Sequence, residues 1–77
     1  MNIYVGAIPV DIEVPGDFCA VAGAVKHRTG ALAIGVRETQ TNVDTINPPD
    51  DLQVGRQHEL IYLAESAILS ETDRQDQ

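Results

Sequence analysis

A helix that runs directly into a strand constrains the fold of this chain more than any other feature. Four apolar residues fall at the i, i+3, i+4 and i+7 spacing of one helical face: Phe18, Val21, Ala22 and Val25. Asp17 can cap the start of this helix, and Gly30 can close its end in the left-handed conformation. The pattern therefore predicts a helix over about residues 18–28.

Alternation in the next segment predicts a central strand. Bulky Leu32, Ile34 and Val36 alternate with small Ala31, Ala33 and Gly35, so we expect one bulky face and one face that allows close approach of the backbone. Polar residues 38–42 predict a hairpin loop into a short strand at 43–46. A proline-rich turn at 47–51 and an apolar run at 60–63 follow.

The alternation of apolar and acidic residues over Val10-Asp11-Ile12-Glu13-Val14 predicts a half-buried strand before the helix. The expected order is strand, helix, strand, strand, strand. We therefore predict a small α+β domain, βαβββ, with a mostly antiparallel sheet and one main helix. We expect residues 1–9 to be a linker or an edge strand, 10–65 the domain, and 66–77 a flexible acidic tail.

Size and charge limit the classes of function. A chain of 77 residues has a small core, so pairing with a second copy would help to stabilise it. A formal net charge of -7 repels phosphate backbones, which argues against nucleic acid as a partner. No apolar run approaches the roughly 20 residues that span a bilayer, and the start lacks the basic region of a signal peptide. We expect a cytoplasmic domain that does not itself insert into a membrane.

Residues that could carry catalysis are few. Cys19 lies in an apolar run, where a small buried side chain is the favoured interpretation. His27 falls at the helix end and His58 beside a strand start, and neither follows a nucleophile motif. The glycines at 30 and 35 lie in an apolar strand pattern, which is not the context of a phosphate-binding loop. We therefore expect no enzymatic activity.

Two small acidic groups could contribute to a cation site. Asp11 and Glu13 would share one face of the predicted strand, and Asp50 and Asp51 are adjacent in the turn. Two carboxylates without a third ligand bind Ca²⁺ weakly, so solvated carboxylates are the favoured alternative. The cofactor is unknown, with a divalent cation or a small anionic ligand as the candidates.

Basic residues predict an anion-binding edge. Arg28 and Lys26 fall at the helix end, and Arg37 falls at the exit of the central strand. Asn47 would lie close to Arg37 if the hairpin pairs as expected, so the candidate ligand-binding set is Arg28, Arg37 and Asn47. The alternative is that these cations balance nearby acids. The residues expected in the core or an interface are Val10, Ile12, Val14, Leu32, Ile34, Val36, Leu60 and Leu63.

Several motifs together resemble the RCK C-terminal domain, also called TrkA-C. They are Arg28-Thr29-Gly30, Gly35-Val36-Arg37, Ile46-Asn47-Pro48-Pro49-Asp50, Gly55 and the run from Leu60 to Ala64. Arg56 stands where the family has an aspartate after the glycine, and Ala64 where it has a closing glycine. The resemblance implies a dimerising domain appended to a nucleotide-binding RCK domain in potassium channels, potassium uptake systems and some antiporters.

This resemblance leads to a functional expectation. A ligand held by the paired domains would favour one mutual orientation and so act on the gate of a potassium channel or transporter. We expect a cytoplasmic, ligand-sensing regulatory domain that works as a homodimer within a membrane channel or transporter. A purely structural oligomerisation module without a ligand is the alternative.

Overall fold

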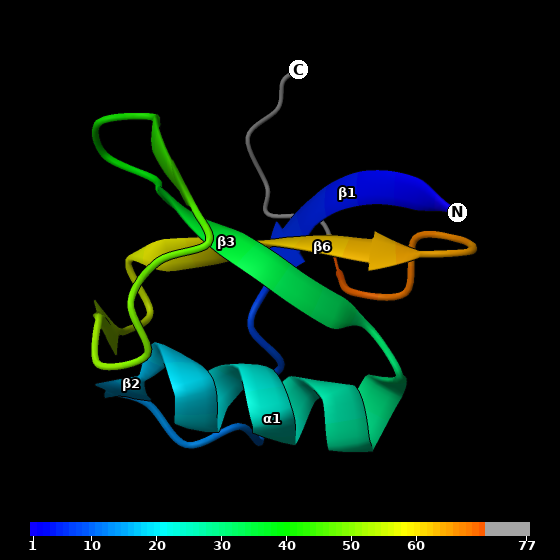
Figure 1. Cartoon of the computed structure of the whole chain (residues 1–77), viewed down its shortest axis with the longest axis horizontal. Helices are drawn as coiled ribbons and strands as arrows, with labels where there is room; N and C mark the ends of the chain where they lie inside the picture. Colours follow the sequence, from blue (N-terminus) through cyan, green and yellow to red (C-terminus); the bar gives the residue numbers. More distant parts are fainter. Residues whose placement is uncertain (71–77) are drawn as a thin grey trace.

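One helix lies against one face of a four-stranded antiparallel sheet in the computed structural model, which describes residues 1–70 (Figure 1). The sheet has the order β1-β6-β3-β4 and contains β1 (Asn2–Ala7), β6 (His58–Ala64), β3 (Leu32–Glu38) and β4 (Val43–Ile46). Two short strands, β2 (Gly16–Asp17) and β5 (Gln53–Val54), pair beside the start of α1 (Phe18–Thr29). The predicted α+β class, with one helix and an antiparallel sheet, is confirmed.

The helix begins and ends where the sequence predicts. The side chain of Asp17 accepts a hydrogen bond from the Ala20 amide at 2.8 Å, and Gly30 closes the helix with φ at 84°. Phe18, Val21 and Val25 form its buried face. Among residues 1–70, no helix has the length and apolar character that crossing a bilayer requires.

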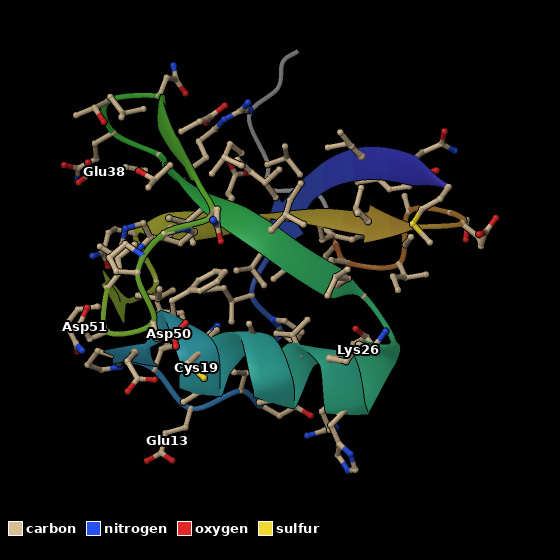
Figure 2. The ribbon with its side chains drawn as sticks, in the orientation of Figure 1. Glu13, Cys19, Lys26, Glu38, Asp50 and Asp51 are labelled. Atoms are coloured by element: carbon tan, nitrogen blue, oxygen red, sulfur yellow. The ribbon has the colours of Figure 1, made fainter. Side chains whose placement is uncertain are left out.

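Cys19 was predicted to be buried, and this is wrong. It is exposed on α1 (Figure 2). Successive helical residues lie about 100° apart, so the residue after Phe18 is turned away from the buried face that Phe18 shares with Val21. An apolar run in the sequence therefore does not place all of its residues in the core.

The first strand of the sheet is formed by residues 2–7, and the predicted strand at 10–14 is wrong. β1 pairs antiparallel with β6 and forms an edge of the sheet, one of the two roles expected for residues 1–9. Residues 10–14 instead form an irregular loop in which Ile12 is buried and Val10 is 93% exposed. The carbonyls of this loop bind the guanidinium of Arg56 rather than a neighbouring strand.

An extra residue in β3 changes which side chains face the core. Ala33 pairs with Tyr62 and Gly35 pairs with Ile61. Over this interval β3 advances by two residues while β6 advances by one, as in a β-bulge. Leu32, which is 47% exposed, therefore lies on the face opposite to Val36, which is 2% exposed. The prediction of one uniformly bulky face is wrong, because strict alternation does not survive the bulge at Ile34. The predicted hairpin into β4 is confirmed.

The two faces of the sheet differ in what covers them. Beneath α1, the core contains Ala33, Val36, Leu60 and Tyr62 from the sheet. We call the opposite side the outer face. Cross-strand pairing arranges it in two apolar rows and one charged row: Ile3, Leu63 and Leu32; Val5, Ile61, Gly35 and Ile46; and Ala7, Glu59, Arg37 and Asp44.

Part of the predicted tail belongs to the folded domain. Leu69 is 6% exposed and packs in the core, although 66–77 was expected to be flexible. The hydroxyl of Tyr62 accepts hydrogen bonds from the amides of Ile68 and Leu69, each at 3.1 Å. The Ala7 amide donates to the Ser70 carbonyl at 2.7 Å. Residues 71–77 of the predicted tail lie outside the described residues.

Gly35 provides a direct test of this strand arrangement. A Cβ at this position would lie 2.4 Å from the Thr45 carbonyl oxygen, so the Gly35→Ala substitution should force β4 away from β3. We expect a loss of about 1–3 kcal/mol in the free energy of unfolding, measured by urea denaturation.

Gly23 supplies the matched control. It is exposed on α1, and nothing lies within 4 Å of the Cβ that alanine would add. Gly23→Ala should leave stability unchanged or raise it by up to about 1 kcal/mol. Equal effects of the two substitutions would contradict the close approach of β4 to Gly35.

Candidate functional site

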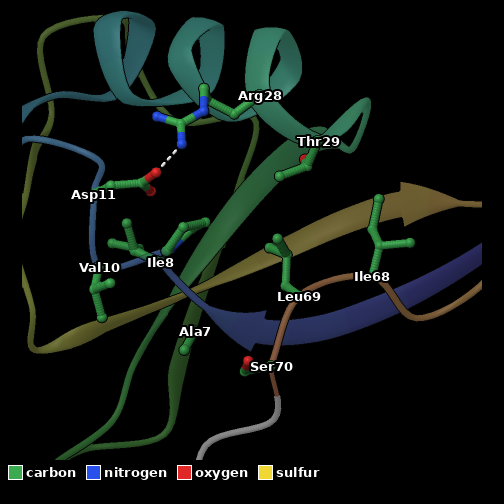
Figure 3. Close-up of a pocket in the computed structure, with 10 residues that line it drawn as sticks. Ala7, Ile8, Val10, Asp11, Arg28, Thr29, Ile68, Leu69 and Ser70 are labelled. Atoms are coloured by element: carbon green, nitrogen blue, oxygen red, sulfur yellow. Dashed lines mark hydrogen bonds and ion pairs between the residues drawn. The ribbon is translucent and has the colours of Figure 1, made fainter.

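A pocket of about 500 Å³ opens between the loop after β1, the end of α1 and the segment that follows β6 (Figure 3). Residues 7–11, 28–29 and 68–70 line it. Its volume lies within the roughly 300–1,000 Å³ range of small-molecule sites. Of the three predicted ligand-binding residues, Arg28 is the one that lines this pocket.

The pocket has an apolar floor and an apolar mouth. Ile8 and Leu69 are 4% and 6% exposed, and they line it from two different segments. Val10 and Ile68, which are 93% and 44% exposed, lie on opposite sides of it (Figure 3). The hydroxyl of Thr29 is engaged by backbone groups, since it donates to the Val25 carbonyl at 2.7 Å and accepts from the amide of residue 31 at 3.1 Å.

An ion pair closes one side of the pocket. Nη2 of Arg28 donates to Oδ2 of Asp11, which joins the last turn of α1 to the loop after β1 (Figure 3). Both side chains are about half exposed, at 51% and 47%, so the pair contributes about 0–1 kcal/mol. Asp11 was expected to share a strand face with Glu13. The two belong instead to an irregular loop, where Glu13 is exposed (Figure 2).

Arg56, for which no functional role was expected from the sequence, holds the wall of this pocket. Nη1 donates to the carbonyls of Ile8 and Pro9 at 2.9 and 3.1 Å. Nη2 donates to those of Val10 and Ile12 at 3.2 and 2.8 Å. A planar guanidinium presents several donors in a fixed geometry, so one side chain fixes the loop at four points.

Arg37 lies between two acids on the outer face. It donates to both carboxylate oxygens of Asp44, at 2.7 and 3.1 Å, and its register partner on β6 is Glu59, which is 2% exposed. The hydrogen bond to Asp44 raises the pKa of Arg37, and the charges of both acids add to this effect. The same bond lowers the pKa of Asp44. The alternative interpretation of Arg37, that it balances nearby acids, describes these contacts.

The structure does not bring the three predicted ligand-binding residues together. The register places Asp44, not Asn47, opposite Arg37. Asn47 is exposed in a left-handed conformation with φ at 54°, and its amide donates to the Ile34 carbonyl at 2.7 Å. Arg28 precedes the start of β3, whereas Arg37 lies near its end, about 17 Å along the strand at 3.3 Å per residue. Whether each residue binds a ligand stays a prediction.

The other candidate residues do not form a cluster. Nδ1 of His58 accepts a hydrogen bond from the Gly55 amide at 3.1 Å, and His27 is exposed on the last turn of α1. Asp50 and Asp51 lie in the turn before β5 (Figure 2). In the part of the chain that the structure describes, no three His, Cys, Asp or Glu side chains gather as a metal site would require.

The clamp by Arg56 predicts a large difference between two arginines. Arg56→Gln should lower the free energy of unfolding by about 1–3 kcal/mol, because it removes hydrogen bonds from a charged donor to several carbonyls. Arg28→Gln, the matched control, breaks one exposed pair and should cost less than about 1 kcal/mol. Urea denaturation gives both values, and amide exchange should rise in the loop over residues 8–12 in the first variant. Equal losses would contradict the clamp.

The pair on the outer face predicts a pH effect. Because the folded-state pKa of Asp44 is lowered, its contribution to stability is present above the unfolded-state pKa and is lost as pH falls through the lowered value. Arg37→Gln should return the carboxyl pKa of Asp44 toward the ordinary value of about 3.9, followed by NMR titration. The Arg56→Gln variant should leave it unchanged. An ordinary pKa in the unmodified protein would contradict the pairing.

The described residues thus offer a pocket at Arg28 and an open outer face at Arg37. A scan of protein-family models finds no match to this chain, and neither the search of curated proteins nor that of solved structures finds one.

Proposed function

We propose that this chain is a non-enzymatic regulatory domain that pairs with a second copy through its outer face and senses a small ligand. The exposure of large apolar side chains on that face carries the proposal. Ile3, Leu32 and Ile46 are 65%, 47% and 57% exposed, and they lie in two neighbouring rows of one sheet. Contiguous apolar surface of this kind is typical of protein interaction sites.

The charged row beside these apolar rows suits a second copy of the same chain. In a two-fold dimer, one surface meets itself, so each positive group can face a negative group of the partner. Arg37 and its partner Asp44, whose side chains are 26% and 39% exposed, give this row both signs of charge at the surface. Such a row sets the orientation of the two copies, while the apolar rows supply most of the affinity.

The strand β1 connects the outer face with the pocket. Ile3 and Val5 belong to the apolar rows, and Ala7, at the other end of β1, lines the pocket and is held by Ser70. A ligand that draws the pocket walls together would therefore act on a strand of the interface. Only a difference in ligand affinity between two dimer arrangements can shift their populations.

The resemblance to RCK C-terminal domains supports a place for this regulation. It favours a cytoplasmic domain beside a nucleotide-binding RCK domain, controlling a potassium channel or potassium transporter. Arg28 is the candidate ligand contact in the pocket, and Arg37 and Asn47 are separate candidates elsewhere. A small anionic ligand and a divalent cation are the two classes that the sequence favours.

A purely structural oligomerisation module is the second candidate, because the outer face supports assembly with or without a ligand. The two functions differ in one measurable property. A sensor changes its dimer affinity or geometry when the pocket is occupied, whereas a structural module does not.

Substitution of the outer face tests the pairing. Leu32→Glu should weaken the dimer at least about tenfold in sedimentation equilibrium, because it places a charge in an apolar row. Ala20→Glu is the matched control, since it adds the same charge to an exposed position of α1, away from the sheet. A protein that stays monomeric at high concentration, or equal effects of both variants, would contradict pairing through the outer face.

A further inference from the structure

The ion pair at the pocket leaves polar atoms of both signs available to a ligand. Nη2 of Arg28 donates to Oδ2 of Asp11. Within residues 1–70, neither side chain makes a second hydrogen bond. A guanidinium has five N–H donors, and a carboxylate has a second oxygen. A ligand carrying both charges can therefore bind beside the existing pair without breaking it, with each of its charges facing the opposite charge of the protein.

The charges around the pocket disfavour a ligand that carries only a negative charge. The chain has a net charge of -7, Asp11 stands beside Arg28, and the pocket lies at the carboxyl end of α1, where the helix dipole is negative. A ligand with only a positive charge would meet Arg28. A zwitterion satisfies both groups, because its carboxylate binds the arginine while its ammonium group lies by Asp11 and the helix end.

The apolar part of the pocket indicates the rest of the ligand. Ile8 and Leu69 form a buried floor, and the exposed Val10 and Ile68 lie on opposite sides of the pocket, with Ile8 and Leu69 between them (Figure 3). Each of these two exposed residues would lose contact with water if an aliphatic group packed against it. An apolar group of a few carbons fits this space next to the ion pair.

We propose that the pocket binds a free α-amino acid with an aliphatic side chain. The carboxylate of the amino acid accepts hydrogen bonds from Arg28, its ammonium group donates to Asp11, and its side chain packs among Ile8, Val10 and Leu69. This inference rests on the sensing function proposed above, and it puts a zwitterion in place of the small anion and the divalent cation that the sequence favours as ligand classes.

A ligand series on the unmodified full chain tests the proposal. Binding is followed by amide NMR shifts during titration with L-leucine, with 4-methylpentanoate, which lacks the amine, with 3-methylbutylamine, which lacks the carboxylate, and with glycine, which lacks the side chain. We expect saturable amide shifts for leucine at residues 8, 10–11, 28–29 and 68–70; Pro9 has no amide proton. Each of the other three compounds should bind at least about tenfold more weakly.

Variants assign the two charges. Arg28→Gln and Asp11→Asn should each weaken leucine binding at least about tenfold, because each removes one charged partner. The controls are Lys26→Gln, a cation on the same helical turn, and Glu13→Gln, a carboxylate in the same loop. Neither residue lines the pocket, so both variants should bind leucine as the unmodified chain does. Dispersed NMR spectra confirm that each variant is folded.

The possible outcomes separate this inference from the proposed function. Equal affinity for leucine and 4-methylpentanoate, equal affinity for leucine and 3-methylbutylamine, or no saturable shift up to the solubility of leucine would each overturn the amino-acid ligand. Sedimentation with and without leucine then tests sensing. If leucine binds without changing dimer affinity or shape, the amino-acid ligand is upheld and the sensing function is overturned. If leucine does not bind but the dimer responds to another ligand, the amino-acid ligand is overturned and the sensing function is upheld.

Discussion

The rest of the structure depends on one extra residue in β3. Between Ala33 and Gly35 the strand takes two steps while β6 takes one, and this reverses the alternation for the remainder of β3. Val36 consequently points to the core beneath α1, and Leu32 points to the outer face. Without the extra residue, one of these two would lie on the wrong side of the sheet. The bulge thus sets the composition of both the core and the outer face.

A second constraint acts on the loop after β1. Arg56 lies in the turn between β5 and β6, and its four hydrogen bonds hold the loop that forms one wall of the pocket. The ion pair of Asp11 with Arg28 joins the same loop to α1. The pocket is therefore built by side chains from distant parts of the chain. Four hydrogen bonds from Arg56 fix its wall, while the pair of Asp11 and Arg28, with both side chains about half exposed, is the weaker of the two contacts.

Local signals in the sequence are sufficient to predict the helix and the antiparallel hairpin. Asp17, Gly30 and the apolar spacing act within a few residues of one another, so no distant contact is needed to interpret them. The loop at 10–14 shows the opposite case. Its alternation is that of a strand, but no strand within residues 1–70 pairs with it. The side chain that binds its carbonyls is Arg56, 44 residues further along from Ile12.

The candidate site was predictable only in part, for the same reason. Arg28 was predicted to be a ligand-binding candidate, whereas Asp11 was weighed as part of a weak cation site with a solvated carboxylate as the favoured alternative. The contact between them was missed because it depends on the path of the loop. The bulge at Ile34 could not be predicted from the alternation of small and bulky residues in this strand. Arg56 did give one signal, since it stands after Gly55 where the family that this chain resembles has an aspartate.

The central claim is that Leu32 belongs to an interface between two copies and not to the core. An isotope-filtered NOE experiment on a mixture of labelled and unlabelled protein tests it most directly. We predict intermolecular contacts that involve the methyl groups of Ile3, Leu32 and Ile46. Intramolecular contacts from Leu32 to Val21 or Val25 of α1, with no intermolecular contacts at the outer face, would contradict both the bulged register and the pairing.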